Sequence, residues 1–162
     1  MAQPYHHPIL PLCDDIDRET EVVWGLACFE RVFGRPAEGM WLSETAVDTA
    51  TLEVVAKHGV EYVLLAPHQI EAVQNSATGE WSDVDSSQTA NRAFRIELPS
   101  GRHIAAVAYD SAVSHAVAFD GLLHSGDRLA NRLADASQET GFVLIATDGE
   151  SYGHHHTHGE MA

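Results

Sequence analysis

The sequence has little cysteine, and its cysteines lie far apart. Cys13 and Cys28 are the two present among 162 residues, and neither belongs to a Cys-x-x-Cys pair. A disulfide framework or a thiolate zinc knuckle needs more numerous or closer cysteines, so neither is indicated and one disulfide at most could form. Such sparing use of cysteine suits a reducing interior, and we expect a cytoplasmic protein.

Positive charge is scarce as well. Lys and Arg number 9 against 24 Asp and Glu, which gives a formal net charge of -15. Nucleic acids and anionic membranes are bound largely by basic residues that neutralise phosphate, so the composition argues against both partners. No apolar run approaches the roughly 20 residues that span a bilayer, and the N-terminus lacks the features of a signal peptide. We expect a neutral or cationic partner.

Apolar residues, in contrast, make up 44% of the chain, enough for one core, and we expect a single domain over residues 1–162. Several stretches repeat apolar residues at helical spacing behind a capping aspartate, and short apolar runs typical of inner strands lie between them. The run 142–146 is one of these. The first expected helix has Asp14, Asp15 and Asp17 at its start and is stopped by Gly34 and Pro36. The other expected helices are 49–58, 111–119 and 127–139, and the expected strands are 39–42, 60–66, 92–98, 102–109 and 142–146.

The order of these elements predicts an α/β fold. A strand, a helix and a second strand follow one another within residues 39–66, which is the pattern of a βαβ unit with parallel strands. Residues 74–91 are polar and lack periodicity, so we expect a long loop there over the mouth of the sheet or barrel. Trp81 in this loop could stack on a sugar ring or pin the loop to the domain.

Ionisable residues are densest directly after the predicted strand 142–146. Asp148 follows its end, where loops of parallel sheets carry functional groups. Three interpretations compete: a solvated polar loop, a metal site, or a general acid/base at Asp148 with a polar wall for a sugar. The other candidates are Glu150, Tyr152, His154, His155, His156 and His158.

A second carboxylate, Glu44, follows the predicted strand 39–42 in the same way. Glycoside hydrolysis needs two acids across one bond, and two acids at the carboxyl ends of strands in one sheet can meet that demand. Asp14 and Asp15 lie at the start of a predicted helix, where capping is the ordinary role, although the pair could also bind a cation.

Three segments at these positions resemble glycoside hydrolase family 57. WLSETAVD (Trp41 to Asp48) is similar to the family's third conserved region, TDGESYGHHH (Thr147 to His156) to the fourth, and YHHPILPL (Tyr5 to Leu12) to the second. The resemblance implies a partial (β/α)7-type barrel with mostly parallel strands and a retaining enzyme acting on α-glucans or related α-linked saccharides. By resemblance, Glu44 is the nucleophile and Asp148 the general acid/base.

The resemblance also implies the surroundings of the two acids. Residues implied to contact the sugar are His7, Trp41, Glu150, Tyr152, His154, His155 and His156. No metal or other cofactor is implied for catalysis, and the implied partner is an oligo- or polysaccharide. The family's first strand and its fifth region lie outside this sequence, so we expect the central part of a catalytic barrel that is poorly active alone and associates through open sheet edges.

Two alternatives from other classes keep the same sheet. A metal-dependent polysaccharide deacetylase would use Asp14, Asp15 and Asp148 with a histidine pair around a divalent cation. A noncatalytic relative would bind carbohydrate and leave it intact whether or not Glu44 is present.

Overall fold

The structure, a computed structural model, describes all 162 residues, which form two compact units. The first unit comprises Met1–Leu65 and Ala93–Val107, and the second comprises Ala66–Arg92 and Ala108–Ala162. Each unit has its own cluster of buried apolar side chains. None of the helices is both long enough and apolar enough to cross a membrane.

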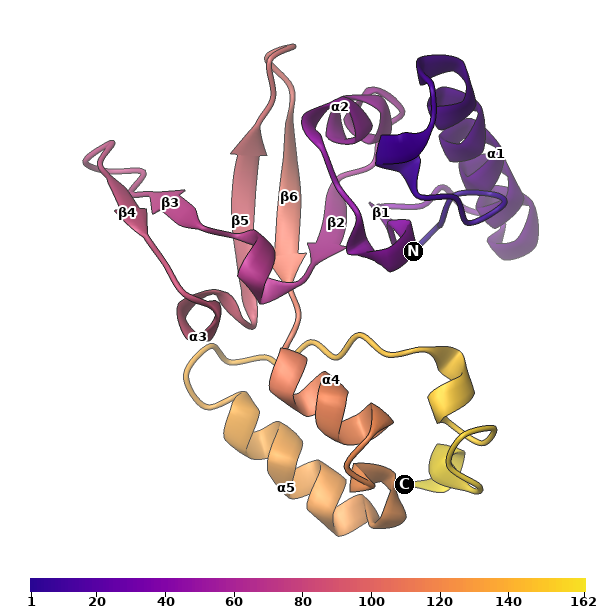
Figure 1. Ribbon diagram of the computed structural model, residues 1–162, viewed down its shortest axis with the longest axis vertical. Helices are drawn as coiled ribbons and strands as arrows, with labels where there is room; N and C mark the ends of the chain where they lie inside the picture. Colours follow the sequence, from indigo (N-terminus) through magenta and orange to yellow (C-terminus); the bar gives the residue numbers. More distant parts are fainter. The chain divides into compact units, whose positions relative to one another are not determined.

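A four-stranded sheet organises the first unit (Figure 1). Its order is β1 (Gly39–Met40), β2 (Tyr62–Leu65), β6 (His103–Ala108) and β5 (Arg92–Glu97). β1 and β2 are parallel, and Ala2 forms a further parallel bridge to Met40 on the other side of β1. The arrows of β2 and β6 point the same way and that of β5 the opposite way. The expected α/β architecture with a mostly parallel sheet is confirmed.

The helix α1 (Asp15–Phe33) begins and ends at the residues expected from the sequence. The Asp14 carboxylate accepts a hydrogen bond from the N–H of Asp17, and Gly34 ends the helix in the left-handed conformation, with φ of 68°. At Gly25 the helix lies so close to the N-terminal segment that a Cβ would overlap the backbone carbonyl of Gln3. The absence of a side chain there lets α1 pack against the sheet edge.

The helix α2 (Thr49–Lys57) connects β1 to β2, which confirms the predicted βαβ unit. Asp48 caps it by accepting a hydrogen bond from the N–H of Thr51 at 2.8 Å. Short 3-10 turns complete the connections in both units: η1 (Leu10–Leu12), η2 (Ser43–Thr45), η3 (Pro67–Gln69), η4 (Leu122–His124), η5 (Gly149–Ser151) and η6 (Gly159–Met161).

The second unit contains α3 (Ser86–Thr89), α4 (Ser111–Ala118) and α5 (Gly126–Ala136). The last two agree with expectation, and Asp110 caps α4 through the N–H of Val113. The prediction of a long loop over residues 74–91 is wrong, because β3 (Ala72–Gln74) pairs antiparallel with β4 (Trp81–Asp83). The Asn75 side chain closes the turn between them by accepting from two following backbone N–H groups.

The predicted strand 142–146 is also wrong. This apolar run is half-buried and extended, but it joins neither sheet. Its backbone groups form separate hydrogen bonds with nearby residues instead of pairing with a strand. The N–H of Leu144 donates to the side-chain oxygen of Asn91, and the carbonyl of Leu144 accepts from the backbone N–H of Asp110. The Asn91 amide also donates to the Asp110 carboxylate at 3.0 Å. Asp148 therefore follows a segment outside both sheets, not the end of a buried strand.

Candidate functional site

Glu44 lies in the first unit, on the turn η2 that follows β1. Leu42 and Ser43 are buried and fix the base of the turn, while the side chain of Glu44 is 76% exposed. The backbone of Glu44 is left-handed, with φ of 57° and ψ of 20°, and that of Thr45 is also left-handed. Non-glycine residues adopt this conformation at a cost and often do so at functional sites. The fold therefore projects this carboxylate into solvent from a strained, well-anchored turn.

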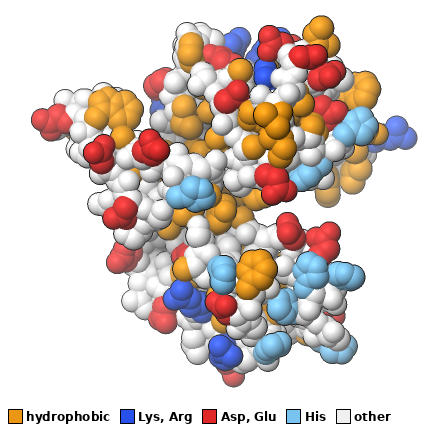
Figure 2. All heavy atoms as spheres, in the orientation of Figure 1, with side chains coloured by type: hydrophobic (Ala, Val, Ile, Leu, Met, Phe, Trp, Pro, Cys, Tyr) orange, Lys and Arg blue, Asp and Glu red, His pale blue; other side chains and the backbone are white.

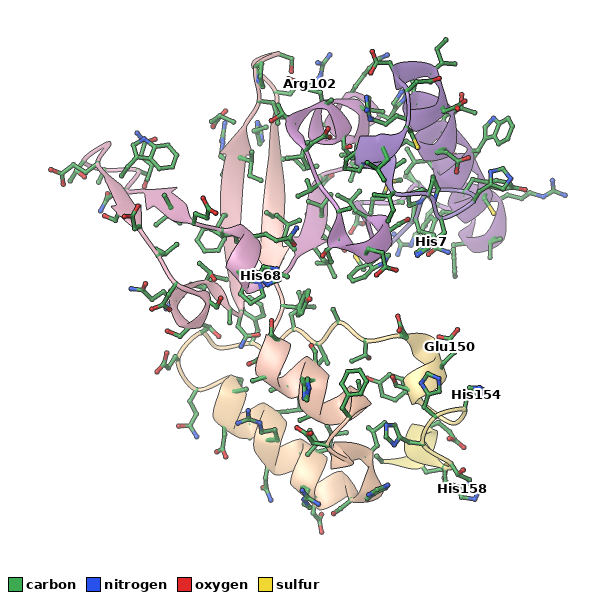
Figure 3. All side chains as sticks on the ribbon, viewed as in Figure 1. His7, His68, Arg102, Glu150, His154 and His158 are labelled. Atoms are coloured by element: carbon green, nitrogen blue, oxygen red, sulfur yellow. The ribbon has the colours of Figure 1, made fainter.

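His7 is the one predicted site residue that the structure places beside Glu44 within this unit. Its Nε2 lies 4.0 Å from Oε1 of Glu44, and its own backbone is left-handed, with φ of 59° (Figure 3). At that distance the two groups interact electrostatically whenever the imidazole is protonated, without a direct hydrogen bond. Two segments far apart in sequence thus meet at Glu44, each through a left-handed residue.

Trp41 precedes the turn and is half-buried. Its backbone N–H donates to the carbonyl of Ala2 at 2.8 Å, which extends the pairing beside β1. Its side chain helps to line an apolar cavity of about 380 Å³ between the N-terminal segment and α1, together with Phe29 and Val32. This cavity could not be predicted from the sequence, because it depends on how α1 packs against the N-terminal segment.

Asp148 lies in the second unit, at the start of the turn η5. Its side chain is exposed and caps no backbone N–H, so the carboxylate is available to a ligand. Glu150 is exposed in the same turn, and its carbonyl accepts from the N–H of His155. The Tyr152 hydroxyl accepts a hydrogen bond from Thr147 at 3.0 Å. These contacts hold a short acidic turn with an aromatic residue at its end.

The histidines of this segment differ in exposure. Figure 2 shows histidine side chains gathered on the surface of the second unit. His154 and His155 are exposed, with ring centroids 5.2 Å apart. His156 is half-buried, and its Nε2 lies 2.8 Å from the carbonyl of Ala118 at the end of α4. Because a carbonyl only accepts, Nε2 of His156 must carry the proton, and this ring fastens the segment to α4.

The structure gathers no three His, Cys, Asp or Glu side chains into a group that could hold a metal ion. Asp14 caps α1, and Asp15 pairs with the buried Arg18 at 2.7 Å, so both carry out structural roles. Glu44 and Asp148 lie in different units, so each acid is positioned by its own local structure.

Comparison with known proteins places these features in a family. The family model of glycosyl hydrolase family 57 matches residues 1–161. The chain belongs to glycosyl hydrolase family 57. This confirms the family expected from the motifs around His7, Glu44 and Asp148. No curated protein sequence matches the chain.

Solved structures share its fold at low sequence identity. The 4-α-glucanotransferase of Thermococcus litoralis has a TM-score of 0.70 and 18% identity, over 99% of this chain and 23% of its own. The maltose-forming amylase of Pyrococcus sp. ST04 has a TM-score of 0.69 and 18% identity, over 94% of this chain and 25% of its own. The family 57 branching enzyme of Thermococcus kodakaraensis has a TM-score of 0.66 and 18% identity, over 97% of this chain and 41% of its own. The chain therefore spans 23% to 41% of these relatives.

The similarity supports the expected fold class, a partial barrel of the (β/α)7 type with mostly parallel strands. That residues 1–162 are one domain from the centre of such a barrel stays a prediction. The roles of the individual site residues rest on the motifs and on the local geometry described above. What the sequence did not predict is the left-handed backbone of Glu44, because no glycine or asparagine marks that position.

Proposed function

We propose that this chain carries the two catalytic acids of a retaining glycoside hydrolase or transglycosidase that acts on α-glucans or related α-linked saccharides. Glu44 is the nucleophile and Asp148 the general acid/base. The observation that carries the proposal is the strained turn at Glu44, which exposes a carboxylate beside His7 within a motif characteristic of family 57. Strain of this kind persists where function requires a fixed side-chain position.

The reaction has two steps. In the first, a Glu44 oxygen attacks the anomeric carbon while Asp148 gives its proton to the glycosidic oxygen, so a glycosyl ester forms and the leaving sugar departs. In the second, Asp148 takes a proton from water or from a sugar hydroxyl, and that oxygen displaces Glu44. Water gives hydrolysis, and a sugar hydroxyl gives transfer. The mechanism requires carboxyl groups roughly 5 Å apart in the active enzyme.

The remaining site residues bind and orient the sugar. His7 lies close enough to Glu44 to contact the same sugar ring, and Trp41, just before the turn, offers an aromatic face. On the other turn, Glu150, Tyr152, His154 and His155 are exposed around Asp148 and supply hydrogen-bonding groups. His156 supports this turn through its bond to Ala118.

The substrate class is inferred from related proteins. The solved relatives include a 4-α-glucanotransferase and a maltose-forming amylase, whose names refer to α-glucans or to maltose, and a branching enzyme that was solved in complex with glucose. Both cysteines are free thiols, which suits the cytoplasm in which we propose that the protein works. A deacetylase site is less well supported, because Asp14 and Asp15 already cap and brace α1.

The test uses Glu44→Gln and Asp148→Asn, with Glu30→Gln as a matched control on an exposed face of α1. With maltoheptaose, each site variant should lose at least about a thousandfold in turnover, whereas the control keeps it. With α-maltosyl fluoride, whose leaving group departs without a proton, Asp148→Asn should keep more turnover than Glu44→Gln. A fluorinated maltosyl fluoride should add its sugar to the peptide that contains Glu44, as mass spectrometry would show.

Wild-type turnover in either site variant would refute these roles. Saccharide binding by the wild-type chain with no turnover even of the activated fluoride would favour the noncatalytic alternative. Loss of turnover on chelation, regained with a divalent ion, would favour the deacetylase alternative instead.

A further inference from the structure

An open hollow of about 330 Å³ lies along the exposed side of α1, and none of its residues belongs to the candidate site. It is lined by Ile16, Glu19, Thr20, Val23 and Trp24. Its volume falls at the lower end of the range typical of small-ligand sites, about 300–1,000 Å³. Trp24 is half exposed and forms an aromatic wall, while Ile16 and Val23 form an apolar floor.

The aromatic wall is held in a fixed orientation. The Trp24 ring meets the ring of Tyr5 edge to face, with centroids 5.7 Å apart and planes at 86°. Tyr5 in turn packs at 89° against His6, whose Nδ1 lies 2.7 Å from a carboxylate oxygen of Glu21. A second bond joins the His6 N–H to the same carboxylate. The indole is therefore preorganised, which lowers the entropic cost of binding a ligand against it.

The polar side of the hollow has a fixed acceptor with an unused oxygen. Oε1 of Glu19 accepts from Nζ of Lys57 at 2.6 Å and lies 2.8 Å from Nε2 of His58. Both bonds go to Oε1, so Oε2 is available. The Thr20 hydroxyl donates to the carbonyl of Ile16 at 2.7 Å and keeps its lone pairs for a ligand donor. The hollow thus pairs two acceptors with an aromatic face.

Charge selects the class of ligand. The Glu19 carboxylate repels an anion, and its pairing with Lys57 leaves little net attraction for a cation. Hydrogen bonds from Lys57 and His58 also lower the pKa of Glu19, which favours its ionised form. A pyranose ring is uncharged, has an apolar C–H face for the indole and carries hydroxyl donors for Glu19 and Thr20.

We propose that this hollow on α1 is a second saccharide-binding site, separate from the catalytic acids, which holds a glucan chain through Trp24, Glu19 and Thr20. The choice of an α-linked glucan rests on the proposed function, whereas the site itself does not require turnover. Such a site would keep a polymeric substrate bound to the protein while one of its ends reacts.

The experiment follows the three indole N–H signals of Trp24, Trp41 and Trp81 by NMR during titration with maltoheptaose. The chain carries Glu44→Gln and Asp148→Asn so that the sugar stays intact, and Trp24→Phe assigns the signal. The Trp24 signal should shift saturably. Glu19→Gln should weaken the Kd read from that signal by roughly fivefold, because a charged acceptor becomes a neutral one. Glu30→Gln, an exposed change elsewhere on α1, should leave it unchanged.

A second readout covers the loss of the indole itself. In native gels that contain amylose, Trp24→Ala should lose at least about tenfold in affinity-dependent retardation, while Glu30→Gln keeps it. A Trp24 signal that stays fixed while Trp41 shifts would overturn the second site and leave the proposed function intact. An equal shift in Glu19→Gln, with an otherwise unchanged spectrum, would also overturn it. Turnover that survives Glu44→Gln would refute the proposed function alone.

Discussion

Asp48 shows how one carboxylate couples the stability of this chain to pH. Burial opposes its ionisation, but the hydrogen bonds at Thr51 outweigh that effect, and the pKa of Asp48 is lowered. A group whose pKa is lowered on folding stabilises the native state above its unfolded pKa and loses this contribution as pH falls through its folded pKa. Asn caps a helix about as well as Asp but carries no charge.

We therefore expect Asp48→Asn to cost little at neutral pH and to flatten the fall in stability with acid. Asp48→Ala, which removes the cap, should cost about 1 kcal/mol at pH 7. Urea unfolding at a series of pH values measures both effects, with Asp83→Asn, an exposed change in β4, as control. Equal losses of stability between neutral and acid pH in wild type and Asp48→Asn would contradict this assignment.

Single residues also mark where the sequence was informative and where it was not. The caps Asp14, Asp48 and Asp110 could be predicted, because a capping carboxylate acts on backbone a few residues away. The left-handed turn at Glu44 could not, because its conformation is imposed by packing and by neighbours distant in sequence.

At the scale of elements, α1 lies very close to the N-terminal segment at Gly25. Alanine normally stabilises a helix interior relative to glycine by about 1 kcal/mol. Here a Cβ would overlap the carbonyl of Gln3, so Gly25→Ala should destabilise the chain by about 1–3 kcal/mol. Urea unfolding tests this, with Gly149→Ala, where a Cβ meets nothing within 4 Å, as control. A stabilised Gly25→Ala variant would refute the contact.

Elements were predictable where the pattern within them was complete. The helices α1, α2, α4 and α5 and the βαβ unit have periodic faces and caps, and they were found. The run 142–146 has the composition of a strand, but a strand also needs a partner, and its backbone bonds go to Asn91, Asp110 and Ser114. The hairpin β3–β4 was missed for the opposite reason, because its strands of three residues are too short for alternation to show.

At the scale of the whole chain, the excess of acidic over basic residues has a measurable effect. A net charge of -15 implies repulsion among carboxylates in the compact state, which added salt screens. Raising NaCl from about 0.01 M to about 0.2 M should therefore raise the Tm, by roughly 2–4 °C for each kcal/mol gained. Calorimetry measures this, and KCl at the same ionic strength should raise the Tm by the same amount. A Tm that falls with salt would show that favourable ion pairs dominate instead.

The family, by comparison, was predictable from three short motifs, because each motif is similar to one of the family's conserved regions. The arrangement of the chain into two compact units was not, since it depends on which apolar faces meet, and apolar composition alone does not specify that.

The left-handed backbone at Glu44 also bears on synthesis. A retaining glycosidase becomes a glycosynthase when its nucleophile is replaced by a small residue and an activated glycosyl fluoride of inverted configuration is supplied. Under the proposed roles, Glu44→Gly would suit that purpose, because glycine adopts this conformation without strain. The same turn that holds a bond-breaking group would then tolerate its removal, and the variant would assemble oligosaccharides instead of degrading them.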